Sequence, residues 1–416
     1  MYLFYLKSIF RKNKQEKSNG MTEEKNNLSS KRSAKRMLRI HPSGLRKLFE
    51  LEHEIAQSST HKILSFGLGN LNIPIMPEII TPLKTALDDP VSHRYSPNAG
   101  LQDLREAIVE RYKNVYCLDY SPNQVVVTSG CLEALIDTFI AYVDPGDEVL
   151  IQDPTFGYYA AQIRLAGGEV KPIPLNNNFE LEADAINEAI TSKTKAIVLN
   201  FPCNPTGSVM TRKQIKAVIE VAVDKGILVV SDEAYEAITY DGHQHTCAAE
   251  IDYDNVVIIS SFSKTYCMTG FRIGYVLAPP EILSSISLVH QYNTACANSP
   301  AQIAARIALH SPTSIRDLMM EELIKRRAEA IKAFTSVNGI ELNYNPLGAF
   351  YIYPNVSGLG MDGTEFSEYL LEKCQIVVVP GLEFGKATPD HVRVSYGFLN
   401  QEDIREAGSR IQSCFS

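Results

Sequence analysis

Four apolar segments of this chain are each followed at once by residues whose side chains or amides can do chemistry. The segments are VVVT (125–128), AIVLN (196–200), ILVVS (227–231) and VVIIS (256–260). The residues that follow them are Ser129, Gly130, Cys131, Asn204, Asp232, Tyr235, Ser261 and Lys264. In an open parallel sheet, ligands bind at the edge where the strands end. If the segments are neighbouring strands, these residues converge on one crevice.

Part of this set is suited to an anion. Gly130, Cys131 and Leu132 open a segment of helical periodicity, and the amides at a helix N-terminus bind phosphate well. Ser261 can add a hydroxyl to the same anion, and Arg272 can add a guanidinium. The sequence therefore predicts a phosphate site at this point.

The remaining residues supply an amine and a carboxylate. Lys264 stands between small residues beside this anion site, and partial burial would lower its pKa and make it a reactive amine. An anion site, a nucleophilic amine and a carboxylate together are what pyridoxal 5'-phosphate requires when it is held as a Schiff base. Lys264 would take the aldehyde, Asp232 the pyridine nitrogen, and Asn204 with Tyr235 the 3-oxygen. The HQH sequence at 243–245 lies in a polar loop, and we expect no metal site.

The elements that must position these residues follow a strand–helix alternation between residues 100 and 280. Apolar runs of five or six residues are typical of strands buried on both faces. The segment 211–226 is a predicted helix, with capping-box spacing between Thr211 and Gln214 and a closing Gly226. This alternation predicts an α/β fold with a mostly parallel sheet covered by helices.

Both ends of the chain have a different pattern. Residues 42–57 have helical periodicity, and helices with short strands follow residue 300. We expect these ends to join as a smaller α+β domain. The predicted division is a basic tail at 1–36, the small domain at 37–70 and 301–416, and the large domain at 71–300.

Composition limits the possible functions. The 416 residues are 45% hydrophobic and 21% charged, as in an ordinary globular protein. Residues 1–40 carry eleven Lys and Arg against three Asp and Glu, whereas the remainder carries 29 against 45. An acidic body argues against a general nucleic-acid surface. The basic first 36 residues are expected to be disordered, and Met21 is a second candidate start.

Membrane insertion and secretion are not expected. The apolar N-terminal stretch is interrupted by Lys7 and is far shorter than the roughly 20 residues of a membrane span. Its basic residues follow the apolar stretch, which is the reverse of a signal peptide. Eight scattered cysteines without a C-x-x-C pair predict reduced thiols in a cytoplasmic protein. His93, His290 and His391 are expected to be structural or surface residues.

From about residue 38 the chain resembles fold type I pyridoxal-phosphate enzymes of the class I/II aminotransferase group, which includes aspartate and aromatic aminotransferases. Seven segments carry the resemblance in the same order and spacing: HPSGLRKL, YSPNAGLQDLREAI, DEVLIQDPTFGYY, NFPCNPTG, SDEAYE, SFSKTYCMTGFRIGY, and VVVPGLEFG with HVRVSYG. For this chain the resemblance implies a PLP-dependent aminotransferase with a sheet of the seven-stranded type.

The resemblance also implies roles for residues that the strand ends do not identify. It implies that Phe156 stacks on the cofactor ring, and that Arg393 binds the substrate α-carboxylate with help from the backbone near Gly69 and from Asn204. Tyr95 matches a tyrosine that reaches the phosphate of a neighbouring subunit, which implies a homodimer. Lys264 would move a proton between the substrate Cα and the cofactor. Phe156 and Tyr95 have an alternative interpretation as packed aromatic residues.

Three departures bear on the substrate. The family usually has G-E-P-D-F where this chain has GNLNI (69–73), and Cys131 and Leu132 replace small or polar residues. No arginine lies in 280–300 to bind a distal carboxylate, which makes a dicarboxylate specialist less expected. An aminotransferase of amino-acid metabolism is preferred. A C–S lyase or decarboxylase on the same scaffold is the alternative, and a PLP-binding regulator is the least expected.

Overall fold

The computed structural model describes residues 33–40, 62–312 and 314–415. Its main feature is a seven-stranded sheet in the order β2-β8-β7-β6-β5-β3-β4. The strands are β2 (Val125–Thr128), β3 (Glu148–Asp153), β4 (Glu169–Pro174), β5 (Thr194–Asn200), β6 (Leu228–Asp232), β7 (Val256–Ser261) and β8 (Gly274–Leu277). All are parallel except β8, which is antiparallel to both of its neighbours. The predicted α/β class and the seven-stranded, mostly parallel sheet are confirmed.

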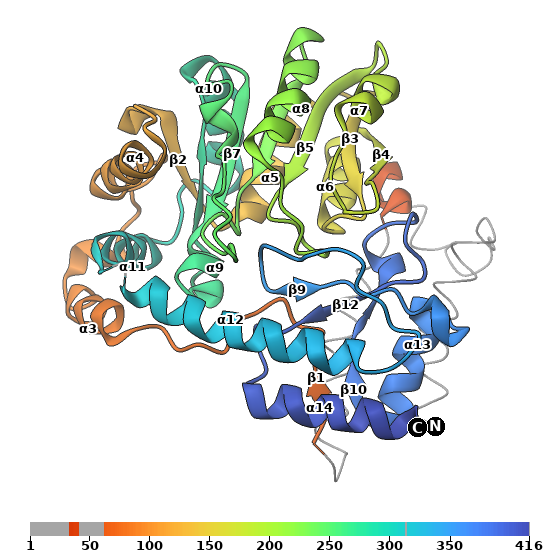
Figure 1. The fold of residues 1–416 in the computed structure, drawn as a ribbon. Helices are drawn as coiled ribbons and strands as arrows, with labels where there is room; N and C mark the ends of the chain where they lie inside the picture. Colours follow the sequence, from red (N-terminus) through yellow and green to blue (C-terminus); the bar gives the residue numbers. More distant parts are fainter. Residues whose placement is uncertain (1–32, 41–61, 313, 416) are drawn as a thin grey trace.

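Helices cover both faces of this sheet (Figure 1). One face is covered by α5 (Cys131–Tyr142), α6 (Tyr158–Ala166) and α10 (Pro280–Asn293). The other is covered by α3 (Pro77–Ala86), α4 (Gln102–Tyr116), α7 (Ala183–Ala189), α8 (Arg212–Asp224) and α11 (Ser299–His310). Every residue of β7 is buried, and a fully buried Val or Ile side chain contributes roughly 1.5–3 kcal/mol. Thr211 caps α8 in a capping box, as the spacing predicts.

The chain ends form a second, smaller core beside the carboxyl edge of the large sheet (Figure 1). Its strands form a three-stranded sheet, β11-β12-β9, and a two-stranded sheet, β1-β10. These are β1 (Leu64–Ser65), β9 (Tyr351–Ile352), β10 (Ile376–Val377), β11 (Val379–Pro380) and β12 (Val392–Ser395). The helices are α12 (Ser314–Thr335), α13 (Gly363–Tyr369) and α14 (Gln401–Cys414). This arrangement brings β12 close to the ends of β5 and β6.

The two-domain division stays a prediction, but packing suggests a later boundary. Ala301, Ala304 and Ala305 of α11 belong to the core formed with α3 and α4, which would place the boundary after residue 310. The predicted helix at 42–57 and residues 1–32 lie outside the described residues. Of the predicted tail, residues 35 and 36 begin a short 3-10 helix, η1 (Lys35–Arg39). Arg39 pairs there with Glu169 of β4.

One cysteine prediction is wrong. Cys374 and Cys414 form a disulfide between the π-helical turn η7 (Leu370–Cys374) and the end of α14. The two elements pack together, which brings cysteines 40 residues apart in the sequence to a Cα–Cα distance of 6.5 Å. Sequence spacing does not reveal such a tertiary contact. The other six cysteines are free thiols.

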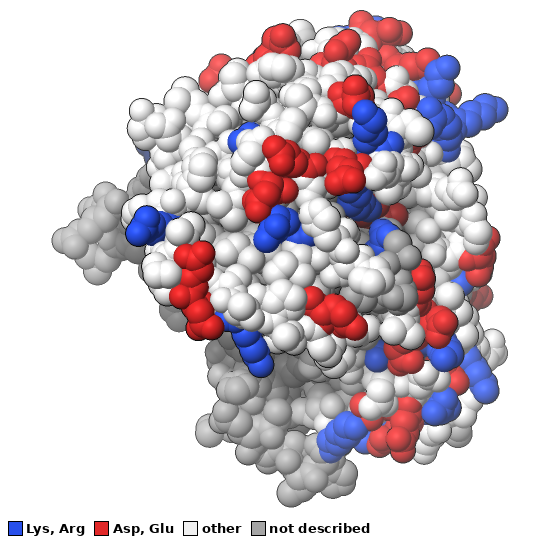
Figure 2. All heavy atoms as spheres, turned by 90° about the vertical axis from the view of Figure 1, so that its left-hand side faces the viewer, with Lys and Arg blue, Asp and Glu red and all other residues white. Residues whose placement is uncertain are grey.

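The surface charge is mixed. On the face beside α3, α4 and α11, acidic and basic groups are interspersed, and most of the visible surface is uncharged (Figure 2). In the part of the chain that the structure describes, no helix is both long and apolar enough to cross a membrane.

Candidate active site

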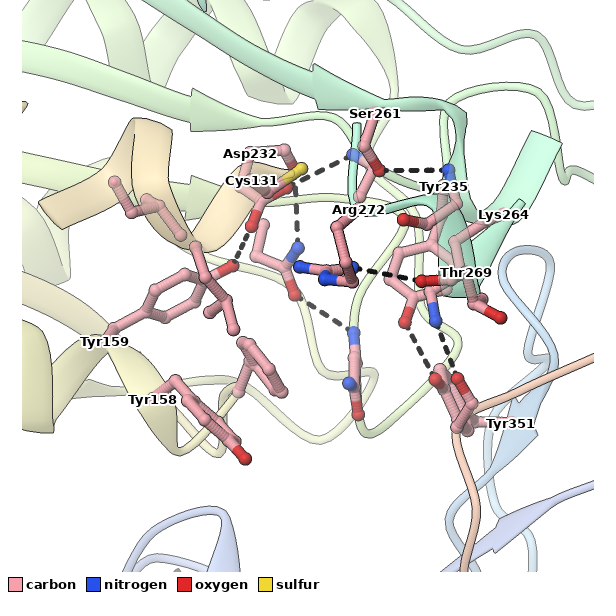
Figure 3. Close-up of a pocket in the computed structure, with 18 of the residues that line it drawn as sticks. Cys131, Tyr158, Tyr159, Asp232, Tyr235, Ser261, Lys264, Thr269, Arg272 and Tyr351 are labelled. Carbon is pink, nitrogen blue, oxygen red and sulfur yellow. Dashed lines mark hydrogen bonds between the residues drawn. The ribbon is translucent and has the colours of Figure 1, made fainter. Parts of the chain in front are cut away.

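A cavity of about 420 Å³ lies where the large sheet meets the smaller core. All of the residues predicted from the sequence line it, Ser263 after β7 included, except Ser129, Gly130 and Tyr95. The structure adds lining residues that sequence analysis missed: Leu135, Tyr158, Tyr159, Asn200, Ala234, Thr269 and Tyr351. Figure 3 shows that these side chains enter from both parts of the fold.

Lys264 lies on α9 (Phe262–Thr265), a single helical turn that follows directly from β7. Ser261 is the N-cap of this turn and accepts a hydrogen bond from the amide of Ser263 at 3.4 Å. The Lys264 Nζ donates to the backbone carbonyl of Gly69 at 2.6 Å (Figure 3). Burial lowers the pKa of Lys264 to about 8. The amine therefore loses its proton far more readily than an exposed lysine does.

Asp232 is the last residue of β6 and is only 4% exposed. Its Oδ2 accepts a hydrogen bond from the hydroxyl of Tyr159 at 2.7 Å, and its Oδ1 accepts one from the amide of Ala234 at 3.2 Å. Burial raises the pKa of Asp232 to about 6, and the bond from Tyr159 opposes this shift. Tyr159 lies on α6 and is fully buried. Nothing in its sequence position distinguishes it from a core tyrosine.

The predicted phosphate site is assembled from three places in the chain: the start of α5, Ser261 at the end of β7, and Arg272. We call this site the anion corner. Helix α5 begins at Cys131, with Gly130 as its N-cap at a φ of +89°. The positive φ favours glycine at this position, and a Cβ there would also lie 2.6 Å from a terminal nitrogen of Arg272. Arg272 donates to the carbonyls of Thr269 and Ser129 at 3.2 and 3.4 Å. Because β8 is antiparallel, it begins at the edge where the other strands end, and this places Arg272 at the crevice.

Arg393, in the middle of β12, is a buried cation with no acidic partner among the residues that the structure describes. It is 1% exposed, and its guanidinium lies within 5 Å of the ring centroids of Tyr351 and Phe384. It donates to the Asn204 Oδ1 at 3.0 Å and to the carbonyl of Gly67 at 2.6 Å. Within the described part of the chain, its Nε has no hydrogen-bond partner. Since a buried charge is costly unless it is paired, this guanidinium is suited to a carboxylate ligand.

The remaining predicted residues hold one another in place. The hydroxyls of Tyr235 and Tyr351 share a hydrogen bond of 2.7 Å (Figure 3). The backbone amide of Asn204 donates to the side-chain Oδ1 of Asn200 at 3.0 Å, which fixes the turn after β5. Phe156 lies in the cavity and stacks on Tyr158 with an interplanar angle of 17°.

Tyr95 does not enter the cavity. It is 91% exposed and precedes α4. Tyr292, Leu288 and Val91 are other large apolar residues with more than half of their surface exposed. The role of Tyr95 in a neighbouring subunit stays a prediction.

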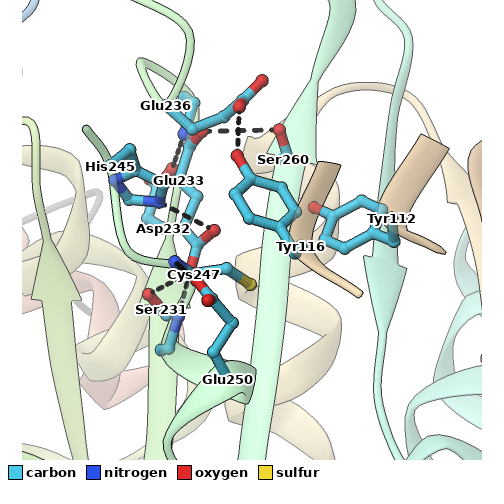
Figure 4. Close-up of polar contacts among 12 residues, drawn as sticks. Tyr112, Tyr116, Ser231, Asp232, Glu233, Glu236, His245, Cys247, Glu250 and Ser260 are labelled. Atoms are coloured by element: carbon cyan, nitrogen blue, oxygen red, sulfur yellow. Dashed lines mark hydrogen bonds and ion pairs between the residues drawn. The ribbon is translucent and has the colours of Figure 1, made fainter. Parts of the chain in front are cut away.

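A second group of buried polar residues lies next to Asp232 on the chain (Figure 4). Glu233 accepts hydrogen bonds from Ser231, His245 and the amide of Ala248 at 3.0, 3.1 and 2.9 Å. Glu236 pairs with Arg111 at 2.6 Å and accepts a bond from Tyr116. These contacts tie the segment after β6 to α4 and to the loop before residue 250.

Comparison with known proteins agrees with this geometry. A model of the family described as aminotransferase class I and II matches residues 61–411. The chain is 37% identical over 383 residues to an aspartate aminotransferase of Pyrococcus horikoshii, covering 91% of this chain and 96% of the relative. It is 34% identical over 384 residues to aromatic-amino-acid aminotransferase 2 of Thermococcus litoralis, covering 91% and 96%.

A solved structure with the same fold is the aspartate aminotransferase of Thermus thermophilus with maleate. It is 29% identical, covers 92% of this chain and 99% of the Thermus chain, and superimposes with a TM-score of 0.87. Together with the family match, these similarities confirm the predicted transaminase activity. This chain belongs to the class I and II aminotransferase family.

Proposed function

We propose that this aminotransferase holds pyridoxal 5'-phosphate in the cavity at Lys264 and moves the amino group of an L-amino acid to a 2-oxo acid there. The observation that carries the proposal is the combination of an amine of lowered pKa, a buried carboxylate and an unpaired buried guanidinium in one cavity. Each of these groups is costly to bury by itself. Together they match an aldehyde, a pyridinium and a substrate carboxylate.

The residues present fit the cofactor. Because Gly130 has no Cβ, the α5 amides, the Arg272 guanidinium and the Ser261 hydroxyl can approach one phosphate. Asp232 would bind the pyridine nitrogen, Tyr235 and Asn204 the 3-oxygen, and Phe156 the ring face. Lys264 would hold the aldehyde. When bound, the cofactor supplies an electron sink for the electrons of the Cα bond that breaks.

The chain's own groups would then bind the substrate and move one proton. Arg393 would bind the α-carboxylate through the nitrogen that now lacks a partner, with Asn204 and the Gly69 backbone beside it. The neutral amine of Lys264 would move a proton from the substrate Cα to the cofactor in the first half of the reaction, and in the opposite direction in the second half. Its lowered pKa keeps a neutral fraction available for this step.

The relatives suggest two broad classes for the side chain of the substrate. Their names include aspartate and aromatic amino acids. Both classes are therefore candidates for this chain. Leu132, Phe156 and Tyr158 give the cavity an apolar and aromatic wall.

We also propose that the enzyme is a cytoplasmic homodimer of amino-acid metabolism. Tyr95 and Tyr292 are exposed by 91% and 81%, and a second copy would cover such side chains. Six of the eight cysteines are free thiols, which favours a reducing compartment, whereas the Cys374–Cys414 disulfide counts against one. Sedimentation of the purified enzyme tests the assembly, since a monomer that is fully active at the lowest measurable concentration contradicts a shared active site.

Incubation of the purified enzyme with single L-amino acids and no oxo acid tests the reaction. Transamination should yield one equivalent of 2-oxo acid per active site and then stop, with absorbance of the bound cofactor shifting to that of its amine form. Continued release of pyruvate and ammonia from serine or cysteine would instead reveal a lyase, and carbon dioxide would reveal a decarboxylase. The panel should contain aspartate, alanine and phenylalanine, because these probe different side-chain classes.

A further inference from the structure

A buried charged cluster lies beneath the anion corner and is not used in the proposed chemistry. It consists of Glu133 and Asp137 on α5 and His290 near the end of α10, and all three are at most 8% exposed. The His290 Nδ1 lies 2.9 Å from the Glu133 Oε1 and 3.7 Å from the Asp137 Oδ2. Its Nε2 lies 2.9 Å from the backbone carbonyl of Asn98.

The partners of His290 determine its protonation. A backbone carbonyl only accepts hydrogen bonds, so Nε2 must carry a proton. Ionised carboxylates also only accept, so Nδ1 carries the second proton and the ring is an imidazolium. Burial alone would lower the pKa of His290, but Asp137 and Glu133 raise it to about 9. These two carboxylates, both on α5, and the Asn98 carbonyl are the groups that the structure places against the ring.

Glu133 connects this imidazolium to the anion corner. It stands in the first turn of α5, and its second oxygen accepts a hydrogen bond from the amide of Ser129. Ser129 precedes Gly130, and its carbonyl also accepts a bond from Arg272. An uncompensated negative charge in this turn would oppose the binding of an anion at the same helix end. Asn98, on the other side of His290, belongs to the segment that carries Tyr95.

We propose that His290, as an imidazolium, is a positioning residue for the phosphate-binding end of α5. It neutralises Glu133, which in turn holds the Ser129 turn, and it fixes the Tyr95 segment against the same helix. The inference rests on the proposed phosphate role of the α5 N-terminus. It predicts that the anion affinity of the active site depends on a charge that contacts neither the cofactor nor the substrate.

The test measures the binding of pyridoxal phosphate and of inorganic phosphate to cofactor-depleted dimers. His290→Gln should weaken both by about tenfold or more, because Glu133 keeps its charge without a counterion. Glu133→Gln should bind both at least as tightly as the native enzyme, since glutamine still accepts from Ser129. The double variant should recover native affinity to within about threefold. A purely structural contact would instead weaken binding in both single variants, and that result would overturn the proposal.

The pH dependence gives a second readout. Phosphate affinity of the native enzyme should fall as the pH rises through about 9, where the imidazolium loses its proton. The His290→Gln variant should lack this step, whereas any step from Lys264 near pH 8 should remain in both proteins. An identical profile in the two proteins contradicts the proposal.

Two further outcomes separate this inference from its premises. Failure of the native enzyme to bind pyridoxal phosphate would contradict the proposed function itself, whereas unchanged affinity in His290→Gln would contradict only this inference. Oxygen and nitrogen atoms of the three side chains lie within 4.8 Å of one another, as metal ligands can. One equivalent of metal in the native enzyme that is lost in His290→Gln would therefore also overturn the proposal. Unfolding curves of each variant confirm that the protein assayed is folded.

Discussion

Arg393 is buried and Arg111 nearly so, with 10% of its side chain exposed, but the two regions treat charge in opposite ways. Arg111 pairs with Glu236 at 2.6 Å beside the buried network next to Asp232. In residues 33–40, 62–312 and 314–415, the acceptors for Arg393 are an amide oxygen and a carbonyl, and its Nε has none. In the network, the charges neutralise one another and tie elements together. In the cavity, the charges are left for a ligand to neutralise, which is why we propose the second region and not the first as the binding site.

The largest effect should follow loss of the cavity's amine. Lys264→Ala should lower kcat by at least about a thousandfold, because both the covalent attachment and the proton acceptor are removed. Cofactor anchoring through Arg272 and the α5 amides should persist, so equilibrium dialysis should still detect bound pyridoxal phosphate. Lys216→Ala, which changes an exposed lysine beside Glu220, is the matched control. Native turnover by Lys264→Ala would contradict the assignment of the site.

Arg393→Ala tests the unpaired guanidinium. It should reduce kcat/KM by the equivalent of about 2–5 kcal/mol, because the substrate carboxylate loses its charged partner. The affinity for pyridoxal phosphate should change little, since Arg393 lies on β12 and not at the anion corner. Steady-state kinetics and cofactor titration of the same preparation measure the two quantities. A loss of cofactor affinity with unchanged kcat/KM would reverse the assignment.

Glu236→Gln tests the paired region in the same way. Removal of the charged partner leaves Arg111 buried, which should cost on the order of 3 kcal/mol of unfolding free energy. The variant should nevertheless retain near-native KM once it is folded, because neither residue lines the cavity. Denaturant unfolding and kinetics below the transition give both values. A large rise in KM without loss of stability would show that the paired region also takes part in binding, which contradicts the comparison.

Tyr159→Phe should have the smallest effect. The hydroxyl lowers the pKa of Asp232 against the effect of burial, so its loss should raise that pKa further above 6. A less ionised carboxylate binds a pyridinium less well, and cofactor affinity should fall by the equivalent of about 1 kcal/mol. The loss should be greater at lower pH. Tyr142→Phe, whose hydroxyl donates to the carbonyl of Ile282, is the control and should show no such pH dependence.

The sequence was sufficient for much of this arrangement because its signals are local. Buried strands read as continuous apolar runs, and the edge at which they end follows from their direction. The sequence therefore correctly places in the cavity residues at a strand end, such as Asp232, and just after one, such as Lys264. Only the family resemblance identifies Arg393, because the sequence of β12 does not show which part of the large sheet this strand faces.

What the sequence did not show depends on tertiary contacts. Tyr159 and Tyr351 read as core aromatics, and only the fold brings their hydroxyls to Asp232 and Tyr235. The Cys374–Cys414 disulfide likewise requires η7 to pack against α14. His290 was expected to be structural, but its two acceptors and the link through Glu133 to the anion corner emerge only when α10 is placed against α5.

The identity of the amine that holds the cofactor is the central claim, and chemical trapping tests it most directly. The native enzyme, saturated with pyridoxal phosphate, would be reduced with borohydride, digested and mapped by mass spectrometry. The peptide that contains Lys264 should carry the reduced cofactor in near-stoichiometric amount, and no other lysine should do so. Attachment at another lysine, or none under these conditions, would contradict the account.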